Sequence, residues 1–321
     1  MKILITGGAG FLGSHLTDAF LHRGATVYIL DTGPTAKVRQ WMGHPALHFV
    51  HDSIFNADVL EALIARVDLV YHLAAVVGVE HYVGDPFQVL NVNVNGTQSV
   101  LRLALKHEKR VVFSSTSEVY GRNPKIPWSE DDDRVLGSTR IDRWCYSTSK
   151  AVGEHFCFAF EKIGLPITVL RYFNVYGPRL DAIDVGRVIT IFLGQALRHE
   201  PVTVVGNGTQ TRCFTYVSDA VAATVEAGLR EAAIGGIFNV GNDKEISIRS
   251  LAERIIAISG SSSEIRYVDQ EDVYGSSYED IPRRVPDIRR MAEVLGVTPA
   301  VSLDDGLRWT IESFRGEVRA R

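Results

Sequence analysis

Tyr146 and Lys150 stand four residues apart, a spacing that places two side chains on the same face of a helix. A lysine cation beside a phenol stabilises the phenolate and lowers a pKa that starts near ~10, so that the tyrosine becomes a usable base at neutral pH. Such pairs are also common on helix surfaces, where they do no chemistry. The interpretation of this pair therefore depends on which other residues the fold brings beside it.

A second reactive cluster, Thr116, Ser117 and Glu118, follows an apolar run that ends at Phe113, after Ser114 and Ser115. Such a run is typical of a buried strand, and side chains just beyond a strand of a parallel sheet face the ligand crevice. The hydroxyl of Thr116 is suited to hold a substrate hydroxyl between the tyrosine and the lysine. Glu118 is interpreted as a group that carries a proton, and the alternative is a solvated carboxylate in a loop.

The segment Thr6-Gly7-Gly8-Ala9-Gly10-Phe11-Leu12-Gly13 follows the first apolar run and opens a helix. Its glycines allow a tight turn and a close approach of backbone N–H groups to a pyrophosphate. Asp31 follows the second apolar run, 18 residues after Gly13, where a carboxylate accepts hydrogen bonds from an adenosine ribose. It would also repel a 2′-phosphate, so that NAD is favoured over NADP. The cofactor contacts predicted here are Gly7, Gly10, Phe11, Leu12, Gly13 and Asp31.

Short apolar runs alternate with helical periodicity from residue 2 to about residue 172. This pattern predicts right-handed βαβ crossovers, and hence a doubly wound α/β domain whose parallel sheet is covered by helices on both faces. Beyond Gly177-Pro178 the pattern is less regular and indicates a smaller α+β lobe. We therefore expect a cofactor domain over 1–172 and a substrate lobe over 173–321, partly interleaved with the first. The helices expected in this lobe cover 186–199, 218–231, 247–258 and 302–314, and its expected strands include VTVV and IFNV.

The 321 residues carry a formal net charge of −4, which gives no basic field for a nucleic acid partner. The apolar stretch at the N-terminus is too short for a signal sequence or a membrane span, and this predicts a cytoplasmic protein without a membrane partner. Three cysteines, Cys145, Cys157 and Cys213, show no CxxC spacing. Neither a metal site nor a disulfide framework is therefore expected.

Taken together, the TGxxGxxG segment, the YxxxK pair and the hydroxyl-rich strand end resemble the extended short-chain dehydrogenase/reductase family, in particular its NAD-dependent nucleotide-sugar epimerases, dehydratases and decarboxylases. Further matching segments are HLAA (72–75), NVNGT (93–97), RYFNVYGP (171–178), GNGTQTR (206–212) and RRVPDIR (283–289). The resemblance covers nearly the whole chain. It implies a Rossmann fold, a tightly held NAD, a UDP-sugar substrate and a homodimer.

The resemblance also assigns residues to the two ligands. Besides the glycine segment, those implied at the cofactor are Asp52, Ser53, Leu73, Ala74, Ala75, Asn93, Tyr146 and Lys150. Those implied at the nucleotide sugar are Asn174, Arg143, Arg187, Val204, Arg212 and Arg284.

Members of this family oxidise the sugar at C4 with the bound NAD, and the resulting ketone makes the C5 proton acidic. The 4,6-dehydratases read Thr-Asp-Glu after the fifth strand, whereas UDP-glucuronate decarboxylases read Thr-Ser-Glu or Ser-Ser-Glu. This chain reads Thr116-Ser117-Glu118, which favours decarboxylation of a C6 carboxylate. Elimination of water across C5 and C6 stays open, with Glu118 as the base at C5 and neighbouring hydroxyls such as Ser117, or the thiol of Cys145, assisting the leaving group.

In length and overall sequence the chain also resembles the UDP-N-acetylglucosamine 5,6-dehydratases of the biosynthesis of tunicamycin, an antibiotic. This resemblance slightly favours a lyase that removes water. A UDP-glucuronate decarboxylase is the close alternative, and a UDP-sugar 4-epimerase is the third. A catalytically silent NAD-binding protein is the alternative from a different class. If Glu118 is the base, Glu118→Gln is predicted to permit transient reduction of NAD but to abolish exchange of the C5 proton.

Overall fold

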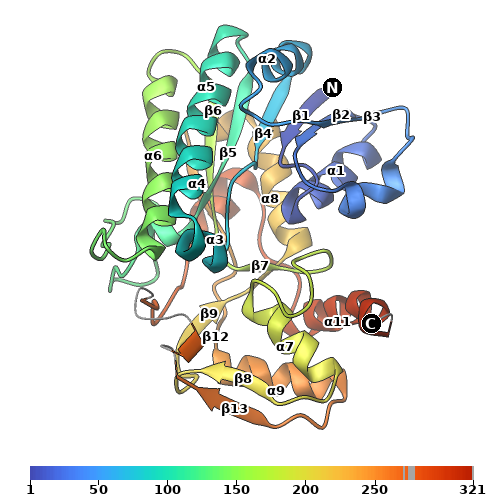
Figure 1. Cartoon of the computed structure of the whole chain (residues 1–321). Coiled ribbons are helices and arrows are strands. Elements are labelled where there is room, and N and C mark those ends of the chain that lie inside the picture. Colours follow the sequence, from blue (N-terminus) through green and yellow to red (C-terminus); the bar gives the residue numbers. More distant parts are fainter. Residues whose placement is uncertain (270–271, 274–278, 320–321) are drawn as a thin grey trace.

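A seven-stranded sheet forms the centre of the upper part of the molecule in the computed structural model, which describes residues 1–269, 272–273 and 279–319, with side chains as far as residue 315 (Figure 1). The strand order is β11-β6-β5-β4-β1-β2-β3, and every neighbouring pair is parallel. The predicted doubly wound sheet is thereby confirmed. Its strands are β1 (Lys2–Thr6), β2 (Thr26–Asp31), β3 (Leu47–His51), β4 (Leu69–His72), β5 (Arg110–Thr116), β6 (Ile167–Tyr172) and β11 (Ile237–Val240).

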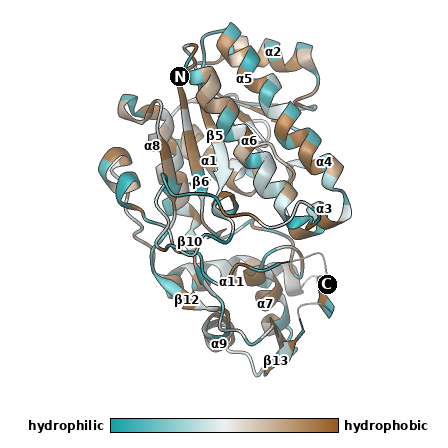
Figure 2. Cartoon of the chain, turned by 90° about the vertical axis from the view of Figure 1, so that its left-hand side faces the viewer, coloured by the Kyte–Doolittle hydropathy of each residue, from teal (hydrophilic) through white to brown (hydrophobic). Residues whose placement is uncertain are grey.

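Helices cover both faces of this sheet, and the sequence of β1 shows why they must. Ile3 and Ile5 belong to one apolar cluster, which includes residues of α1 and α8, whereas Leu4 belongs to another, which includes residues of α2, α5 and α6. Successive side chains of a strand point to opposite faces, so a strand that is apolar throughout is buried on both sides. Figure 2 shows these hydrophobic strands enclosed between the helices. The helices are α1 (Phe11–His22), α2 (Ala57–Arg66), α5 (Thr97–Lys106), α6 (Arg143–Glu161) and α8 (Val217–Leu229).

A smaller lobe lies below the sheet in Figure 1 and combines helices with short strand pairs. The strand predicted here as IFNV is not part of it, because it forms β11 at the edge of the main sheet, beside β6. The chain beyond residue 172 therefore contributes to both parts of the molecule. The lobe and its junction contain β7 (Val175–Tyr176), α7 (Val188–Leu197), β8 (Val202–Val205), β9 (Thr211–Cys213), β10 (Thr215–Tyr216), β12 (Glu245–Ser247), α9 (Ile248–Ser259), β13 (Ile265–Val268) and α11 (Leu303–Arg319).

The remaining elements are short, and several of them border the crevice between the two parts. α6 begins at Arg143, so that Tyr146 lies within its first turn rather than at its start.

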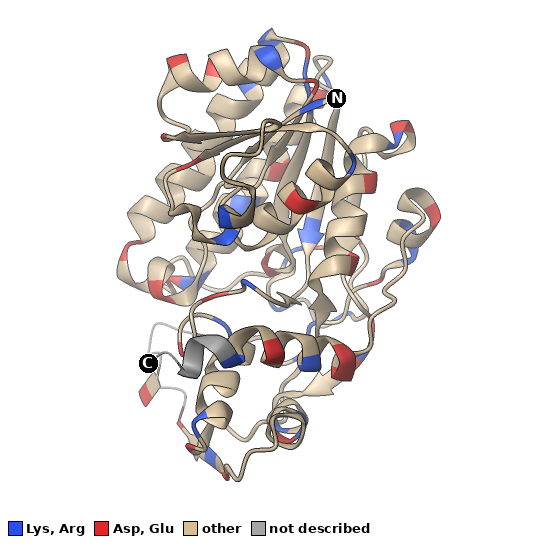
Figure 3. Ribbon diagram, turned by 90° about the vertical axis from the view of Figure 1, so that its right-hand side faces the viewer, with Lys and Arg blue, Asp and Glu red and all other residues tan. Residues whose placement is uncertain are grey.

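None of the helices in the described residues is long and apolar enough to cross a membrane. In the view of Figure 3, positive and negative residues are interspersed over the ribbon. The short elements are α3 (Val79–Gly84), α4 (Pro86–Leu90), a π-helical turn (Asn91–Gly96), a second such turn (Met291–Leu295) and 3-10 turns at Thr35–Trp41, Ser117–Tyr120 and Glu231–Ala233.

Candidate active site

A cavity of about 1070 Å³ lies at the carboxyl ends of the central strands, between the sheet and the smaller lobe. Most residues predicted at the site line it, from the glycine segment to Arg284. Three do not, namely Cys145, Asn93 and Val204, although Thr203 and Val205 on either side of Val204 do. The predicted residues that line the cavity are Gly7, Gly10, Phe11, Leu12, Gly13, Asp31, Asp52, Ser53, Leu73, Ala74, Ala75, Thr116, Ser117, Glu118, Arg143, Tyr146, Lys150, Asn174, Arg187, Arg212 and Arg284.

The glycine segment forms a backbone cradle between β1 and α1. A Cβ at Gly13 would lie 2.3 Å from the carbonyl oxygen of Gly7, and one at Gly7 would lie 2.7 Å from the amide nitrogen of Ala74. Gly7 also has a φ of +73°, which side-chain-bearing residues rarely adopt. The cradle thus needs glycine at both positions, and it opens at the N-terminus of α1, where free N–H groups favour an anion. This geometry fits the pyrophosphate of a dinucleotide.

Two aspartates border the part of the cavity beside the glycine segment. Asp31 accepts hydrogen bonds from the backbone N–H groups of Ala9 and Gly33, both at 2.8 Å, and so ties the glycine segment to the end of β2. Asp52 accepts a hydrogen bond from the backbone N–H of Ser53 at 2.7 Å. Each carboxylate oxygen retains a lone pair for a ribose hydroxyl or an adenine amino group, as the fit to NAD requires.

Asn93 supports the site from behind instead of lining it. Its side chain accepts from the backbone N–H of Val76 at 2.9 Å and donates to the Val76 carbonyl at 3.1 Å and to the Ser149 hydroxyl at 3.1 Å. The asparagine is buried. It therefore fixes the loop after β4 against α6. The sequence prediction of a direct cofactor contact did not indicate this supporting position.

Tyr146, Lys150 and Thr116 are brought together at the end of β5. Burial raises the pKa of Tyr146 to about 12, and the charge of Glu118 raises it further, whereas a hydrogen bond with Thr116 lowers it. Burial lowers the pKa of Lys150 to about 8, and its amino group donates to the carbonyl of Ser114 at 2.8 Å. The prediction of a lowered tyrosine pKa is therefore wrong for the protein alone, where the phenol is neutral.

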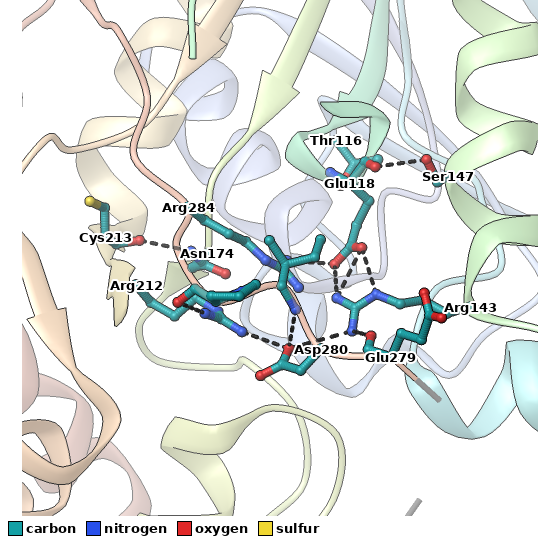
Figure 4. Close-up of polar contacts among 12 residues, drawn as sticks. Thr116, Glu118, Arg143, Ser147, Asn174, Arg212, Cys213, Glu279, Asp280 and Arg284 are labelled. Carbon is teal, nitrogen blue, oxygen red and sulfur yellow. Dashed lines mark hydrogen bonds and ion pairs between the residues drawn. The ribbon is translucent and has the colours of Figure 1, made fainter. Parts of the chain in front are cut away.

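Glu118 is enclosed by arginines, as Figure 4 shows. Its carboxylate accepts from Nε and from the terminal nitrogen of Arg143 at 3.2 and 3.0 Å, and from Arg284 at 2.5 Å. Burial by itself would raise the pKa of Glu118, but the charges and hydrogen bonds of the two arginines lower it to about 2. The interpretation as a solvated carboxylate is thus wrong, because Glu118 is buried and paired; it is ionised at neutral pH and a weaker base than an unpaired glutamate, and its role as a base stays a prediction.

Asp280 completes this cluster and was not identified from the sequence. It accepts from Arg212 at 2.8 Å and lies 3.5 Å from the guanidinium of Arg143. Burial would raise the pKa of Asp280, but the charges of Arg212, Arg284 and Arg143 lower it. The Nε of Arg284 is buried and has no hydrogen-bond partner in the described structure, so its N–H can still donate to an oxygen of a ligand. The one sequence signal for Asp280 is an acidic residue shortly before RRVPDIR.

The remaining predicted residues lie outside the cluster around Glu118. Asn174 donates to the Cys213 carbonyl at 2.9 Å, and Arg187 pairs with Asp181 at 3.0 Å. Ser117 is buried. Burial raises the pKa of the Cys145 thiol to about 11, and the charge of Asp142 adds to this effect. A thiol that does not line the cavity is poorly placed to assist a leaving group there.

Residues 3–241 match the model of the NAD dependent epimerase/dehydratase family. The UDP-N-acetyl-alpha-D-glucosaminuronate decarboxylase of Bacillus cytotoxicus is 41% identical over 98% of this chain and 98% of its own length. UDP-glucuronic acid decarboxylase 1 of Xenopus tropicalis is 40% identical over 99% of this chain and 73% of its own length. The structure of a UDP-glucuronic acid 4-epimerase from Bacillus cereus, with UDP-glucuronic acid and NAD, has a TM-score of 0.88 at 33% identity and covers 99% of this chain and 100% of that one.

Proposed function

The chain belongs to the NAD dependent epimerase/dehydratase family, and we propose that it is a decarboxylase of UDP-uronates such as UDP-glucuronate. Membership makes it a nucleotide-sugar enzyme with NAD as its cofactor. The observation that carries the proposal is the pairing of Glu118 with Arg143 and Arg284. Two decarboxylases among its relatives, which act on different UDP-uronates, support it.

The charge state of Glu118 favours decarboxylation over dehydration. Removal of the C5 proton requires a base, and a carboxylate with a pKa of about 2 is a weak one. A β-keto acid loses carbon dioxide without a base at C5. Arg143 and Arg284 suit a planar carboxylate, because guanidinium groups bind carboxylates in a bidentate manner. A substrate carboxylate would thus find at this point the partners that Glu118 occupies in the protein alone.

The residues at the end of β5 account for the redox steps. NAD held by the glycine segment and Asp31 would supply the transfer of hydride from C4 and back to it, and its positive charge in the oxidised form would favour the Tyr146 phenolate. Tyr146 would take the proton of the C4 hydroxyl, with Thr116 holding that hydroxyl and Lys150 stabilising the phenolate. The C5–C6 bond then breaks, its electron pair moves toward the C4 ketone, and carbon dioxide leaves. A proton from water adds to C5, and Tyr146 returns its proton as C4 is reduced, which gives a UDP-pentose.

Dehydration lacks a matching set of groups. The elimination needs an acid at the C6 oxygen as well as a base at C5. The chain has serine, Ser117, where 4,6-dehydratases carry aspartate, and Cys145 does not line the cavity. The dehydration that the sequence slightly favoured therefore has less support in this geometry than its alternative.

The deciding experiment incubates the purified enzyme in deuterated buffer with UDP-glucuronate, UDP-N-acetylglucosaminuronate or UDP-N-acetylglucosamine. Mass spectrometry and NMR then identify the products. We expect loss of carbon dioxide from a uronate with deuterium at C5. Loss of water from UDP-N-acetylglucosamine would instead establish the dehydratase, and a uronate inverted at C4 with its carboxylate retained would establish an epimerase.

A homodimer also belongs to this proposal, as the family resemblance implies. α4 packs against α6 and exposes Phe87 and Leu90, with exposed fractions of 75% and 39%. An apolar helical face of this kind favours association of two copies. Light scattering at micromolar concentration should give twice the mass of the chain, and the mass of a single chain would contradict a stable dimer.

A further inference from the structure

α6 carries a second buried charge one turn beyond the catalytic lysine. Glu154 is 5% exposed, and both of its oxygens are used. Arg171 donates to them from Nε at 2.9 Å and from a terminal nitrogen at 2.7 Å, and the Ser115 hydroxyl donates at 2.5 Å. Neither Glu154 nor Arg171 lines the cavity. This ion pair therefore does not bind a ligand there, although its serine does border the site.

The partners of Glu154 come from two adjacent strands. Ser115 on β5 and Arg171 on β6 are directly paired in the sheet. Arg171 also donates to the carbonyl of Glu130 at 2.9 Å, and its guanidinium lies 4.7 Å from the centre of the Tyr120 ring. Burial would lower the pKa of Arg171, but its bonds to Glu154 raise it. Arg171 is thus charged, and hydrogen bonds from β5 and β6 hold the Glu154 side chain in place.

Two consecutive residues of β5 connect to α6 at consecutive turns. The carbonyl of Ser114 accepts from Lys150, and the hydroxyl of Ser115 donates to Glu154. The end of the same strand, one residue later, carries Thr116. These two bonds fix the position of α6 along β5, and hence the position of the Lys150 amino group relative to Thr116.

Glu154 is also the negative charge that acts on Lys150. Two other titratable groups near the lysine, Cys157 and His72, are neutral at pH 7, because burial raises the pKa of Cys157 well above its usual value and lowers that of His72 to about 3. Burial likewise keeps the Tyr146 phenol neutral in the protein alone. Glu154 therefore opposes the effect of burial on the lysine and keeps it protonated.

We propose that Glu154 is a positioning residue, which holds α6 in register with the end of β5 and keeps Lys150 protonated for the transfer of hydride from C4. The inference rests on that oxidation step of the proposed function, which decarboxylation shares with dehydration and epimerisation. It does not depend on which bond breaks afterwards.

The direct test is NMR of protein labelled with 13C at the lysine Cε, since the chain has only eight lysines. Lys150→Arg assigns the signal. In Glu154→Gln the titration midpoint of Lys150 should fall by about one pH unit, the scale expected for loss of a nearby opposite charge. Glu161→Gln, an exposed change on the same helix, should leave the midpoint unchanged, and Glu154→Asp should largely restore it. An unchanged midpoint in folded Glu154→Gln would overturn the proposal.

The kinetic test follows NADH absorbance in a single turnover at different pH values. The rate should fall on the alkaline side as Lys150 loses its proton, and this limb should move to lower pH in Glu154→Gln but not in Glu161→Gln. If the single variant does not fold because Arg171 stays unpaired, Glu154→Gln/Arg171→Gln removes both charges, and a smaller shift in the same direction is expected, because the lost Arg171 cation opposes the effect of Glu154. An unshifted limb in that folded double variant contradicts the proposal. A failure of the proposed function would appear separately, in the identity of the product.

Discussion

Glu118→Gln removes the carboxylate that pairs with Arg143 and Arg284, and the structure gives the size of the effect. Lowering the pKa of Glu118 from 4.5 to about 2 corresponds to ~3 kcal/mol of stability at neutral pH. The side chain is only 12% exposed, so solvent screens this little. Because the folded pKa lies below the unfolded one, the contribution is present above pH 4.5 and is lost as the pH falls toward 2. Urea unfolding should show that the difference in the free energy of unfolding between wild type and Glu118→Gln decreases as the pH falls through that range.

The same substitution should change which sugars bind best. It removes the carboxylate that Arg143 and Arg284 share and leaves Asp280 as the acidic group beside Arg143, so a ligand that carries its own carboxylate can take the place of Glu118, whereas a neutral sugar cannot. The diphosphate is common to UDP-glucuronate and UDP-glucose, and the ratio of their affinities therefore isolates the sugar carboxylate. We expect this ratio to rise by about tenfold in favour of UDP-glucuronate, which corresponds to ~1.4 kcal/mol.

Calorimetry in a Tyr146→Phe background measures both affinities without turnover. Glu161→Gln in the same background is the control, because it removes one exposed carboxylate at the opposite end of α6 from Arg143. If Glu118→Gln changes the two affinities by the same factor, Arg143 and Arg284 serve the nucleotide alone. The structural argument for a uronate substrate would then be refuted, whatever the stability data show.

Three further substitutions test separate parts of the site. Tyr146→Phe should slow the appearance of NADH by ~10²–10⁴-fold while the protein stays folded by circular dichroism, and a smaller loss would mean that another group takes the C4 proton. Gly13→Ala should weaken NAD binding by about tenfold or more, because its Cβ would lie 2.3 Å from the oxygen of Gly7, whereas Gly84→Ala, with nothing within 4 Å, should bind NAD normally in fluorescence titrations. Cys145→Ser should leave the rate of carbon dioxide release within about twofold of wild type, and a large loss would assign the thiol a role in the reaction.

The sheet and the cofactor cradle could be predicted because their determinants are local. Apolar runs and the glycine spacing act over a few residues, and the doubly wound order follows from βαβ handedness. The position of β11 could not be predicted in this way, since IFNV indicates a short buried strand but not which strand it pairs with. Asn93 shows a similar limit, because its motif places it near the cofactor but does not show that its bonds go to Val76 and Ser149.

The charge of Glu118 illustrates why the reaction was harder to predict than the fold. Its tripeptide is local, but the groups that set its pKa lie 25 and 166 residues further along the chain, at Arg143 and Arg284. Arg284 lies in a segment whose backbone bonds to Trp128, in the long connection that follows β5, and this long-range pairing places it beside Glu118. A glutamate with the same neighbours in sequence would be a base if these arginines pointed elsewhere, since burial alone raises its pKa. In this site, the ion partners of the carboxylate therefore carry more information about the reaction than the tripeptide does.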